Sequence, residues 1–176
     1  MTIKDNKHLI VYDGLTQKRF DMENNGITLS KVIPTTAQGK KVLLVAYKHG
    51  YRPYYVLIED KKHNETVKIQ NLEKFSEKKE NYAYLSGAVS RASVGGKRNF
   101  HTGITRMEEG KKIHISKLSS KGGVEKDFYI TTDKNGQFGM YVLPGLYTVI
   151  HGTKKEFHLK SGENGIFLVS IKSMFD

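Results

Sequence analysis

Short apolar segments recur along the whole chain, and most of them alternate with polar residues. Alternation with a period of two is typical of half-buried strands, whereas a continuous apolar run with β-branched residues is typical of a central strand. We therefore expect strands at 9–12, 27–32, 42–47, 54–58, 65–72, 82–90, 111–118, 127–132, 146–150, 157–159 and 167–171. Helical periodicity is nearly absent, so the pattern predicts an all-β protein.

Turn signals separate these segments. Asp13-Gly14 lies between two apolar runs, which is a hairpin signal. Lys134-Asn135-Gly136 and Pro144-Gly145 reverse the chain twice within the short segment 131–150. The chain has 17 glycines and only 3 prolines, and it is rich in Tyr, Val, Ile and Thr, a composition that favours sheet over helix. Short strands separated by regular turns predict small antiparallel β-sandwiches.

The charged segment 73–81 interrupts the strand pattern near the middle of the chain and contains a single aromatic residue, Phe75. Such a segment is typical of a linker or a short helical connector. The two flanking halves each end with an apolar strand, a glycine turn, another strand, a polar hairpin and a final alternating strand. The sequence therefore predicts two tandem β-sandwich modules, 1–73 and 83–176, joined by a linker at 74–82.

Bulk composition narrows the function classes. The 176 residues are 38% hydrophobic and 27% charged, which is enough for a buried core. The absence of cysteine excludes disulfides, thiolate zinc sites and cysteine nucleophiles. The first residues lack the apolar run of a secretory signal, and no stretch is long and apolar enough to span a membrane. We therefore expect a soluble chain made in the cytoplasm, without membrane insertion.

The net charge of +11 permits binding to nucleic acid, acidic lipid or an acidic protein surface. The excess consists mostly of scattered lysines, and no run resembles a basic recognition helix. A specific nucleic-acid footprint should cluster on one face. Nucleic-acid binding therefore ranks third among the predicted functions.

Candidate chemistry is sparse. Gly95-Gly96-Lys97 lacks the spacing and the helix of a phosphate-binding loop, and Asp133-Lys134-Asn135-Gly136 lacks the later acidic ligands of a calcium loop. The seven histidines show no metal-ligand spacing. We expect no catalytic residue, metal, cofactor or small-molecule substrate, and hence no enzyme.

A family resemblance comes from Thr132-Asp133-Lys134-Asn135-Gly136-Gln137-Phe138, followed by Leu143-Pro144-Gly145-Leu146-Tyr147. These residues resemble the carboxypeptidase regulatory-like, or transthyretin-like, β-sandwich domain. Leu85-Ser86-Gly87-Ala88-Val89 is similar to the first strand of that family, and Gly50-Tyr51-Arg52-Pro53 is similar to an end of the same module. The resemblance covers 83–176 well and 8–72 loosely. The resemblance implies the fold, whereas the function has to be inferred from a specific site.

Each motif residue has a structural role in this interpretation. Asp133 is expected to bond backbone amides of its turn, and Gly136 to take the left-handed conformation that other residues resist. Phe138 then returns to the core, and Tyr147 follows the second turn. The fold-defining residues predicted in this way are Gly50, Tyr51, Pro53, Asp133, Gly136, Phe138, Pro144, Gly145 and Tyr147.

The segment Gly95–Glu109 is predicted to be a long loop, and long loops on a rigid scaffold often carry binding. It mixes basic and aromatic side chains, a combination that suits an acidic surface or nucleic acid. The alternative is a variable surface loop. The candidate interaction residues are Lys97, Arg98, Phe100, His101 and Arg106.

We expect a non-enzymatic structural or docking protein whose exposed edge strands pair with a neighbour. Modules of this kind recur in tailed-phage virions, so the resemblance implies a virion component of the baseplate or tail, with other structural proteins of the same assembly as partners. If the chain is not viral, we expect it in the cytoplasm. The second function is a surface- or carbohydrate-binding accessory module of a bacterial cell-envelope protein.

Overall fold

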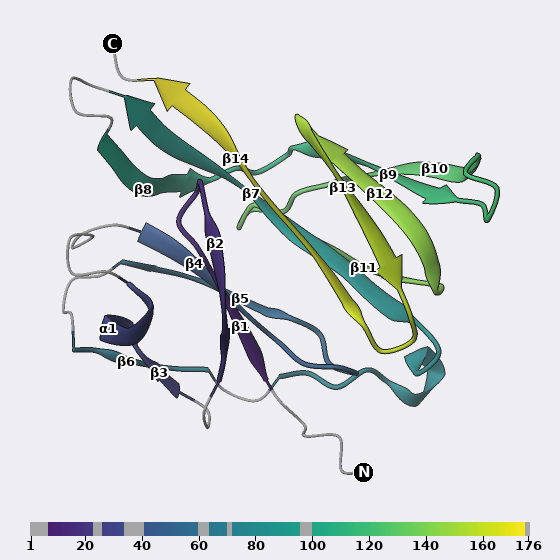
Figure 1. Cartoon of the computed structure of the whole chain (residues 1–176), viewed down its shortest axis with the longest axis horizontal. Coiled ribbons are helices and arrows are strands. Elements are labelled where there is room, and N and C mark those ends of the chain that lie inside the picture. The colour runs from purple at the N-terminus through teal and green to yellow at the C-terminus, as the bar shows by residue number, and fades with distance from the viewer. Residues whose placement is uncertain are drawn as a thin grey trace.

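The computed structural model describes residues 7–22, 26–33, 41–59, 64–69, 72–95 and 100–174 (Figure 1). The elements of the N-terminal half are β1 (His8–Tyr12), β2 (Gln17–Asp21), β3 (Gly26–Thr28), α1 (Leu29–Val32), β4 (Lys41–Tyr47), β5 (Tyr54–Glu59) and β6 (Thr66–Lys68). A 3-10 helix, η2 (Glu77–Lys79), precedes the C-terminal half. That half contains β7 (Ala83–Gly95), β8 (Phe100–Met107), β9 (Lys112–Leu118), β10 (Val124–Thr131), β11 (Gln137–Val142), β12 (Gly145–His151), β13 (Thr153–Leu159) and β14 (Asn164–Met174). The predicted all-β sandwich architecture is confirmed.

The strands form three stacked layers, and the two-stranded β3–β6 sheet lies outside them. Two of these layers belong to one continuous eight-stranded sheet, and we call them the N-terminal and central sheets. The N-terminal sheet has the order β5-β4-β1-β2. The central sheet is built on β7, with β14 on one side and with β11 and β8 on the other. The outer sheet has the order β10-β9-β12-β13. A single residue pair, Lys41 with Gly103, connects the N-terminal sheet to β8 of the central sheet.

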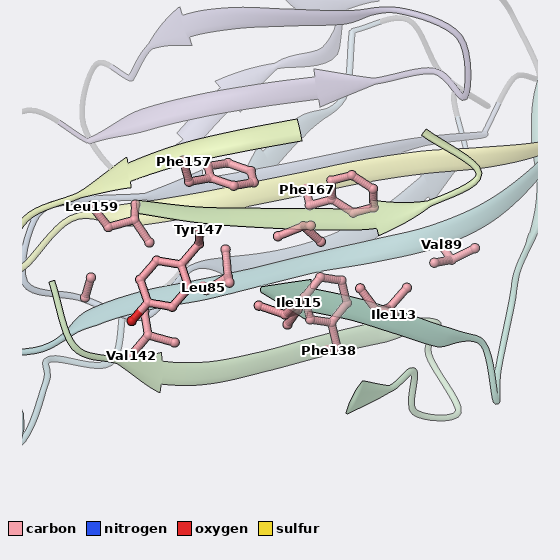
Figure 2. Close-up of a cluster of buried hydrophobic side chains, with 12 residues drawn as sticks. Leu85, Val89, Ile113, Ile115, Phe138, Val142, Tyr147, Phe157, Leu159 and Phe167 are labelled. Atoms are coloured by element: carbon pink, nitrogen blue, oxygen red, sulfur yellow. The ribbon is translucent and has the colours of Figure 1, made fainter. Parts of the chain in front are cut away.

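The C-terminal core lies between the central and outer sheets (Figure 2). Alternate residues of each strand point into it, as the period of two requires. Burial of each large apolar side chain contributes about 1.5–3 kcal/mol to stability. The buried members of this core are Ala83, Leu85, Val89, Ile113, Ile115, Phe138, Val142, Tyr147, Val149, Phe157, Leu159 and Phe167.

The N-terminal sheet is covered on both faces. One face packs under α1 and the β3–β6 pair, with Leu9, Leu44 and Leu29 among the buried residues. The other face packs against the central sheet through a third cluster of buried residues, which we call the interlayer core. It consists of Tyr12, Leu43, Val45, Ala88, Ile104 and Ile166. The two halves therefore share buried surface.

Residues 74–82 also bind the halves together. The Phe75 N–H donates to the Gly50 carbonyl at 2.9 Å, and the Phe75 ring packs edge-on against Tyr141. The Phe75 side chain is buried. The predicted division at 74–82 into independent modules stays a prediction.

The structure differs from the predicted elements at residues 27–32. The segment was expected to be one strand, but β3 ends at Thr28 and α1 follows. Leu29 and Val32 are both buried because residues three apart lie on the same side of a helical turn. Apolar residues at positions 27, 29 and 32 are compatible with a strand and with a helical turn. Packing of Leu29 and Val32 on the N-terminal sheet favours the helix.

One strand pair also runs in an unexpected direction. β14 pairs with β7 in parallel, from Asn164 opposite Tyr84 to Met174 opposite Val94. The chain reaches β14 from β13 of the outer sheet through the turn 160–163, so it changes layers there. β14 has only β7 as a pairing partner among the described strands, and its other edge is unpaired.

Candidate functional site

The Asp133 turn has a structural arrangement. Asp133 Oδ1 accepts the backbone N–H groups of Asn135 at 2.8 Å and Gln137 at 3.0 Å. Gly136 has a φ of 70°, and a Cβ there would lie 2.7 Å from the Val89 carbonyl oxygen. Another side chain at this position would therefore meet both backbone strain and a backbone clash. Asp133 therefore shapes the turn before β11, and the Gly136 carbonyl accepts the Val89 N–H of β7 at 2.8 Å.

The residues that follow this turn belong to the core. Phe138 and Tyr147 are both buried (Figure 2). The Tyr147 hydroxyl donates to the Leu143 carbonyl at 2.6 Å, across the Pro144-Gly145 turn between β11 and β12. The Tyr147 side chain therefore stabilises the turn that precedes it.

Gly50, Tyr51 and Pro53 lie where the two halves meet. The Gly50 N–H donates to the Gly162 carbonyl at 2.8 Å. The side-chain amide of Asn164, at the start of β14, donates to the Lys48 and Tyr51 carbonyls at 3.0 and 3.1 Å. These contacts fix the beginning of β14 against the β4–β5 connection.

The prediction of a long loop at Gly95–Glu109 is wrong where the structure describes this segment, and the interaction role of its residues stays a prediction. β7 extends to Gly95, and residues 100–107 form β8, so the segment is largely a strand hairpin. Phe100, His101 and Arg106 lie on β8, while Lys97 and Arg98 lie outside the described residues. Glycines and polar residues indicated a loop, but the backbone of this segment pairs with β7.

Arg106 has a structural partner in the buried Glu108. Glu108 Oε1 accepts hydrogen bonds from Arg91 Nε at 2.5 Å and Arg106 Nε at 2.9 Å. Burial raises the pKa of Glu108, but these two guanidinium groups outweigh it and hold the pKa at about 2. The three side chains therefore form a charged clamp between β7 and β8.

A serine, a histidine and an aspartate meet on the exposed face of the outer sheet. Asp127 Oδ1 accepts hydrogen bonds from Ser116 Oγ and, at 2.8 Å, from His114 Nε2. These hydrogen bonds, with that from Ser116 first, lower the pKa of Asp127. A nucleophilic triad needs the serine and the aspartate on different ring nitrogens of the histidine. Here Ser116 and Asp127 both approach Nε2, and Ser116 is only 4% exposed, so the cluster does not have the geometry of a triad.

The candidate site is a groove along the unpaired edge of β14. Two hollows of about 730 and 340 Å³ share Gln17 and Lys155 and so continue one another. The β1–β2 hairpin forms one wall, and β13 with the preceding turn forms the other. Residues of β14 from Asn164 to Lys172 form the floor. The edges of all three sheets thus meet in one surface feature.

Peptide groups of β14 face this groove at every second residue, because successive residues of a strand direct their N–H and C=O groups to opposite edges. The Glu163 carbonyl accepts the Tyr84 N–H of β7, so the odd-numbered residues point toward β7. Leu168, Ser170 and Lys172 therefore direct their peptide groups into the groove. These groups are suited to pairing with another strand.

The charges along the groove are all positive. No Asp or Glu is among the described residues that line either hollow. Basic residues line both walls and the end of the floor, and they are Lys18, Arg19, Lys154, Lys155 and Lys172. The groove is therefore complementary to an anionic ligand.

Lys155 crosses from β13 to the edge of β14. Its Nζ donates to the Ile166 carbonyl at 3.3 Å, and burial lowers its pKa. A lysine on a strand edge is a common protection against unwanted strand pairing. Here it covers the groove-facing carbonyl of Ile166 and leaves the stretch from Leu168 to Lys172 beyond it.

The sequence reasoning identified exposed edges in general but missed this groove. Its walls come from segments more than a hundred residues apart, Gln17–Arg19 and Thr153–Phe157. The available signals were the long alternating final strand and the adjacent lysines 154 and 155. Neither signal shows which edge of the strand stays unpaired.

In the part of the chain that the structure describes, no group of three or more His, Asp or Glu side chains is placed to hold a metal ion. No helix among the described residues is long and apolar enough to cross a membrane.

Comparisons with known proteins do not assign a family. No protein-family model matches the chain, and no curated protein matches it. A solved structure described as the crystal structure of S.CueP is 14% identical and aligns over 76% of this chain and 71% of its own, with a TM-score of 0.31. A likeness at that TM-score carries no argument about fold or function. The resemblance to the carboxypeptidase regulatory-like domain stays a prediction.

Proposed function

We propose that this protein is a non-enzymatic docking protein that receives an extended segment of a partner by strand addition to β14. The observation that carries the proposal is the unpaired edge of β14, which lies as the floor of a groove between β2 and β13. In strand addition, main-chain hydrogen bonds provide affinity and the flanking side chains provide specificity. The groove offers unpaired main-chain groups on β14 and flanking side chains on its two walls.

The geometry suits one strand better than a bulky ligand. The groove follows an 11-residue strand, and Leu168, Ser170 and Lys172 offer both donors and acceptors in sequence. A small molecule is usually enclosed by its pocket, whereas this feature is an elongated surface groove. An extended chain would therefore contact more of the groove than a small molecule would.

The partners that we propose are other structural proteins of one assembly, and the setting implied by the family resemblance is a tailed-phage virion. This setting stays a prediction. Proteomic analysis of purified particles would test it, and absence of the chain from them would contradict the virion role while leaving the docking role intact.

Amide hydrogen exchange tests the docking role directly. In the free protein, the groove-facing amides of Leu168, Ser170 and Lys172 should exchange faster than those of Val169 and Ile171, which bond β7. A bound strand should slow the first set and leave the second unchanged. Synthetic ten-residue peptides with alternating valine and polar residues serve as probes. If no such peptide slows these amides, strand addition at β14 is wrong.

Lys172→Pro sharpens this test, with Lys172→Ala as its matched control. Proline at 172 removes a groove-facing N–H without removing a hydrogen bond to β7. Lys172 is exposed, so both variants should fold. We expect Lys172→Pro to weaken peptide binding about tenfold through the lost donor and the blocking ring, and Lys172→Ala to weaken neutral-peptide binding less than about twofold. Equal effects of the two variants would contradict backbone pairing at this position.

A further inference from the structure

Resting on the docking function proposed above, we infer that the groove binds an acidic extended segment of a partner protein, with carboxylates at alternate positions facing β13. The charges on the walls, the alternation of side chains in a docked strand and the poor fit of other ligands favour such a segment.

Along the larger hollow, the wall formed by β13 carries two lysines, whereas the β1–β2 wall carries no charged lining residue. Lys154 and Lys155 are adjacent in sequence, and both line the larger hollow. Lys155 Nζ has a long 3.3 Å hydrogen bond to a neutral carbonyl in a partly desolvated position. A carboxylate beside this ammonium group would supply the opposite charge that burial makes valuable.

Along the larger hollow the β1–β2 wall has a different chemistry, because its basic residues Lys18 and Arg19 line only the smaller hollow. The β1–β2 turn presents Leu15, which is 40% exposed, together with Gly14 and Gln17. The nearby Asp13 carboxylate is occupied by the turn itself, since its Oδ1 accepts the Leu15 and Thr16 N–H groups at 2.8 and 2.7 Å. Side chains of a docked strand alternate between the two walls. The guest should therefore place acidic residues toward β13 and apolar or small residues toward the turn.

A second copy of this chain is a poor occupant. Pairing of β14 with β14 of another molecule would bring two basic grooves together, in a chain whose net charge is already +11. Like charges placed opposite one another oppose association. The acidic segment must therefore come from a different protein.

Single-stranded nucleic acid also fits poorly. Such ligands need exposed aromatic side chains on which bases stack. The aromatic residues that line the larger hollow, Tyr12 and Phe167, are 6% and 1% exposed. In the smaller hollow Phe157 is 9% exposed and Tyr47 is half-buried, so the described residues offer no fully exposed ring along the groove. Phosphates also offer only acceptors, whereas the β14 edge presents N–H and C=O groups together. An acidic peptide satisfies the charge and both kinds of backbone group.

Binding of three ten-residue peptides to the full chain, measured by isothermal titration calorimetry, tests the inference. The peptides alternate valine with glutamate, serine or lysine. We expect the glutamate peptide to bind at least about tenfold more tightly than the serine peptide, with an affinity that falls as salt is added, and the lysine peptide not to bind. A single-stranded oligonucleotide with the same number of negative charges is the fourth probe.

The double variant Lys154→Gln/Lys155→Gln locates the effect. It should weaken the glutamate peptide about tenfold and change the serine peptide less than about twofold. Lys121→Gln/Lys134→Gln is the matched control, because it removes the same charge at two exposed turn positions that do not line the groove. The control should weaken the glutamate peptide less than about twofold.

The outcomes separate the inference from the docking role. Equal binding of the glutamate and serine peptides would overturn the acidic preference and leave strand addition standing. Equal losses in the two double variants would overturn the assignment to the β13 wall. Tighter binding of the oligonucleotide than of the glutamate peptide would overturn the inference in favour of nucleic acid. If none of the probes binds, both the inference and the docking role fall.

Discussion

The two halves of the molecule bury their strands in different ways. The C-terminal half closes a core between two sheets of its own (Figure 2). The N-terminal half has one four-stranded sheet, with a short helix and a strand pair on one face and the central sheet on the other. The first half therefore depends on the second for the burial of Leu43 and Val45, whereas the core of the second half is complete without the first.

The largest expected effect comes from separating the halves. Residues 74–176 alone should keep their sandwich, whereas residues 1–73 alone should be unfolded, because their sheet would expose the interlayer core residues and the fragment is small. Dispersion of amide resonances in NMR spectra of each fragment measures this. A well-dispersed spectrum of 1–73 would show that the predicted independent modules are real.

Within the C-terminal half, Gly87→Ala should be the most damaging single change. A Cβ at Gly87 would overlap the Phe167 carbonyl of β14 and would lie 2.7 Å from the Phe138 ring. We expect a loss of about 4 kcal/mol or more in the free energy of unfolding, measured with urea. The control is Gly123→Ala, whose Cβ would meet only Ser119 Oγ at 3.7 Å and should cost less than about 0.5 kcal/mol. Similar costs for both would mean that β14 does not lie so close to β7.

Glu108→Gln should remove about 3 kcal/mol of stability, because it leaves the Arg91 guanidinium without its buried carboxylate. Neighbouring Glu109 is exposed, and Glu109→Gln should cost less than about 0.5 kcal/mol. Urea unfolding of both variants at neutral pH provides the measurement. A cost for Glu108→Gln no larger than for Glu109→Gln would contradict the clamp.

The same clamp predicts a pH dependence. The pKa of Glu108 is lowered from 4.5 to about 2, so the unfolded chain binds this proton more readily. Its contribution of about 3 kcal/mol is present above pH 4.5 and is lost as the pH falls toward 2. The Gln variant should lose less stability than the original protein over this range. If the free energy of unfolding of the two proteins fell equally between pH 4.5 and about 2, Glu108 would not be the group responsible.

The smallest effect concerns the contact between the halves. The Tyr55 hydroxyl and Ser86 Oγ are 2.7 Å apart in the interlayer region, and Ser86 is 1% exposed. Tyr55→Phe should cost about 1–2 kcal/mol, because Ser86 is left unsatisfied, and adding Ser86→Ala should recover part of the loss. Tyr54→Phe, at a 48% exposed position, is the control with no expected effect. Strict additivity of the two changes would indicate that the halves are not coupled through this bond.

Much of the fold was predictable because it depends on local patterns. Short apolar runs located β1, β4 and β5, alternating segments located most of the C-terminal strands, and glycine placed the turns after Asp13 and Asp133. The Gly95–Glu109 segment was incorrectly predicted to be a loop, because Ile104 is the one buried apolar residue among the described side chains of β8, which is held by pairing with β7. Residues 29–32 were also misassigned, because their pattern fits a helical turn as well as a strand.

The sequence by itself determined the all-β class, the main strands and the absence of any cysteine chemistry, since these follow from composition and from the period of two. Only the tertiary structure decided that β14 pairs in parallel with β7, and that its other edge lies between β2 and β13. Strand direction, edge exposure and the grouping of lysines from distant segments are set by how the layers stack. No local pattern along the chain encodes that arrangement, and it is the arrangement that makes the groove.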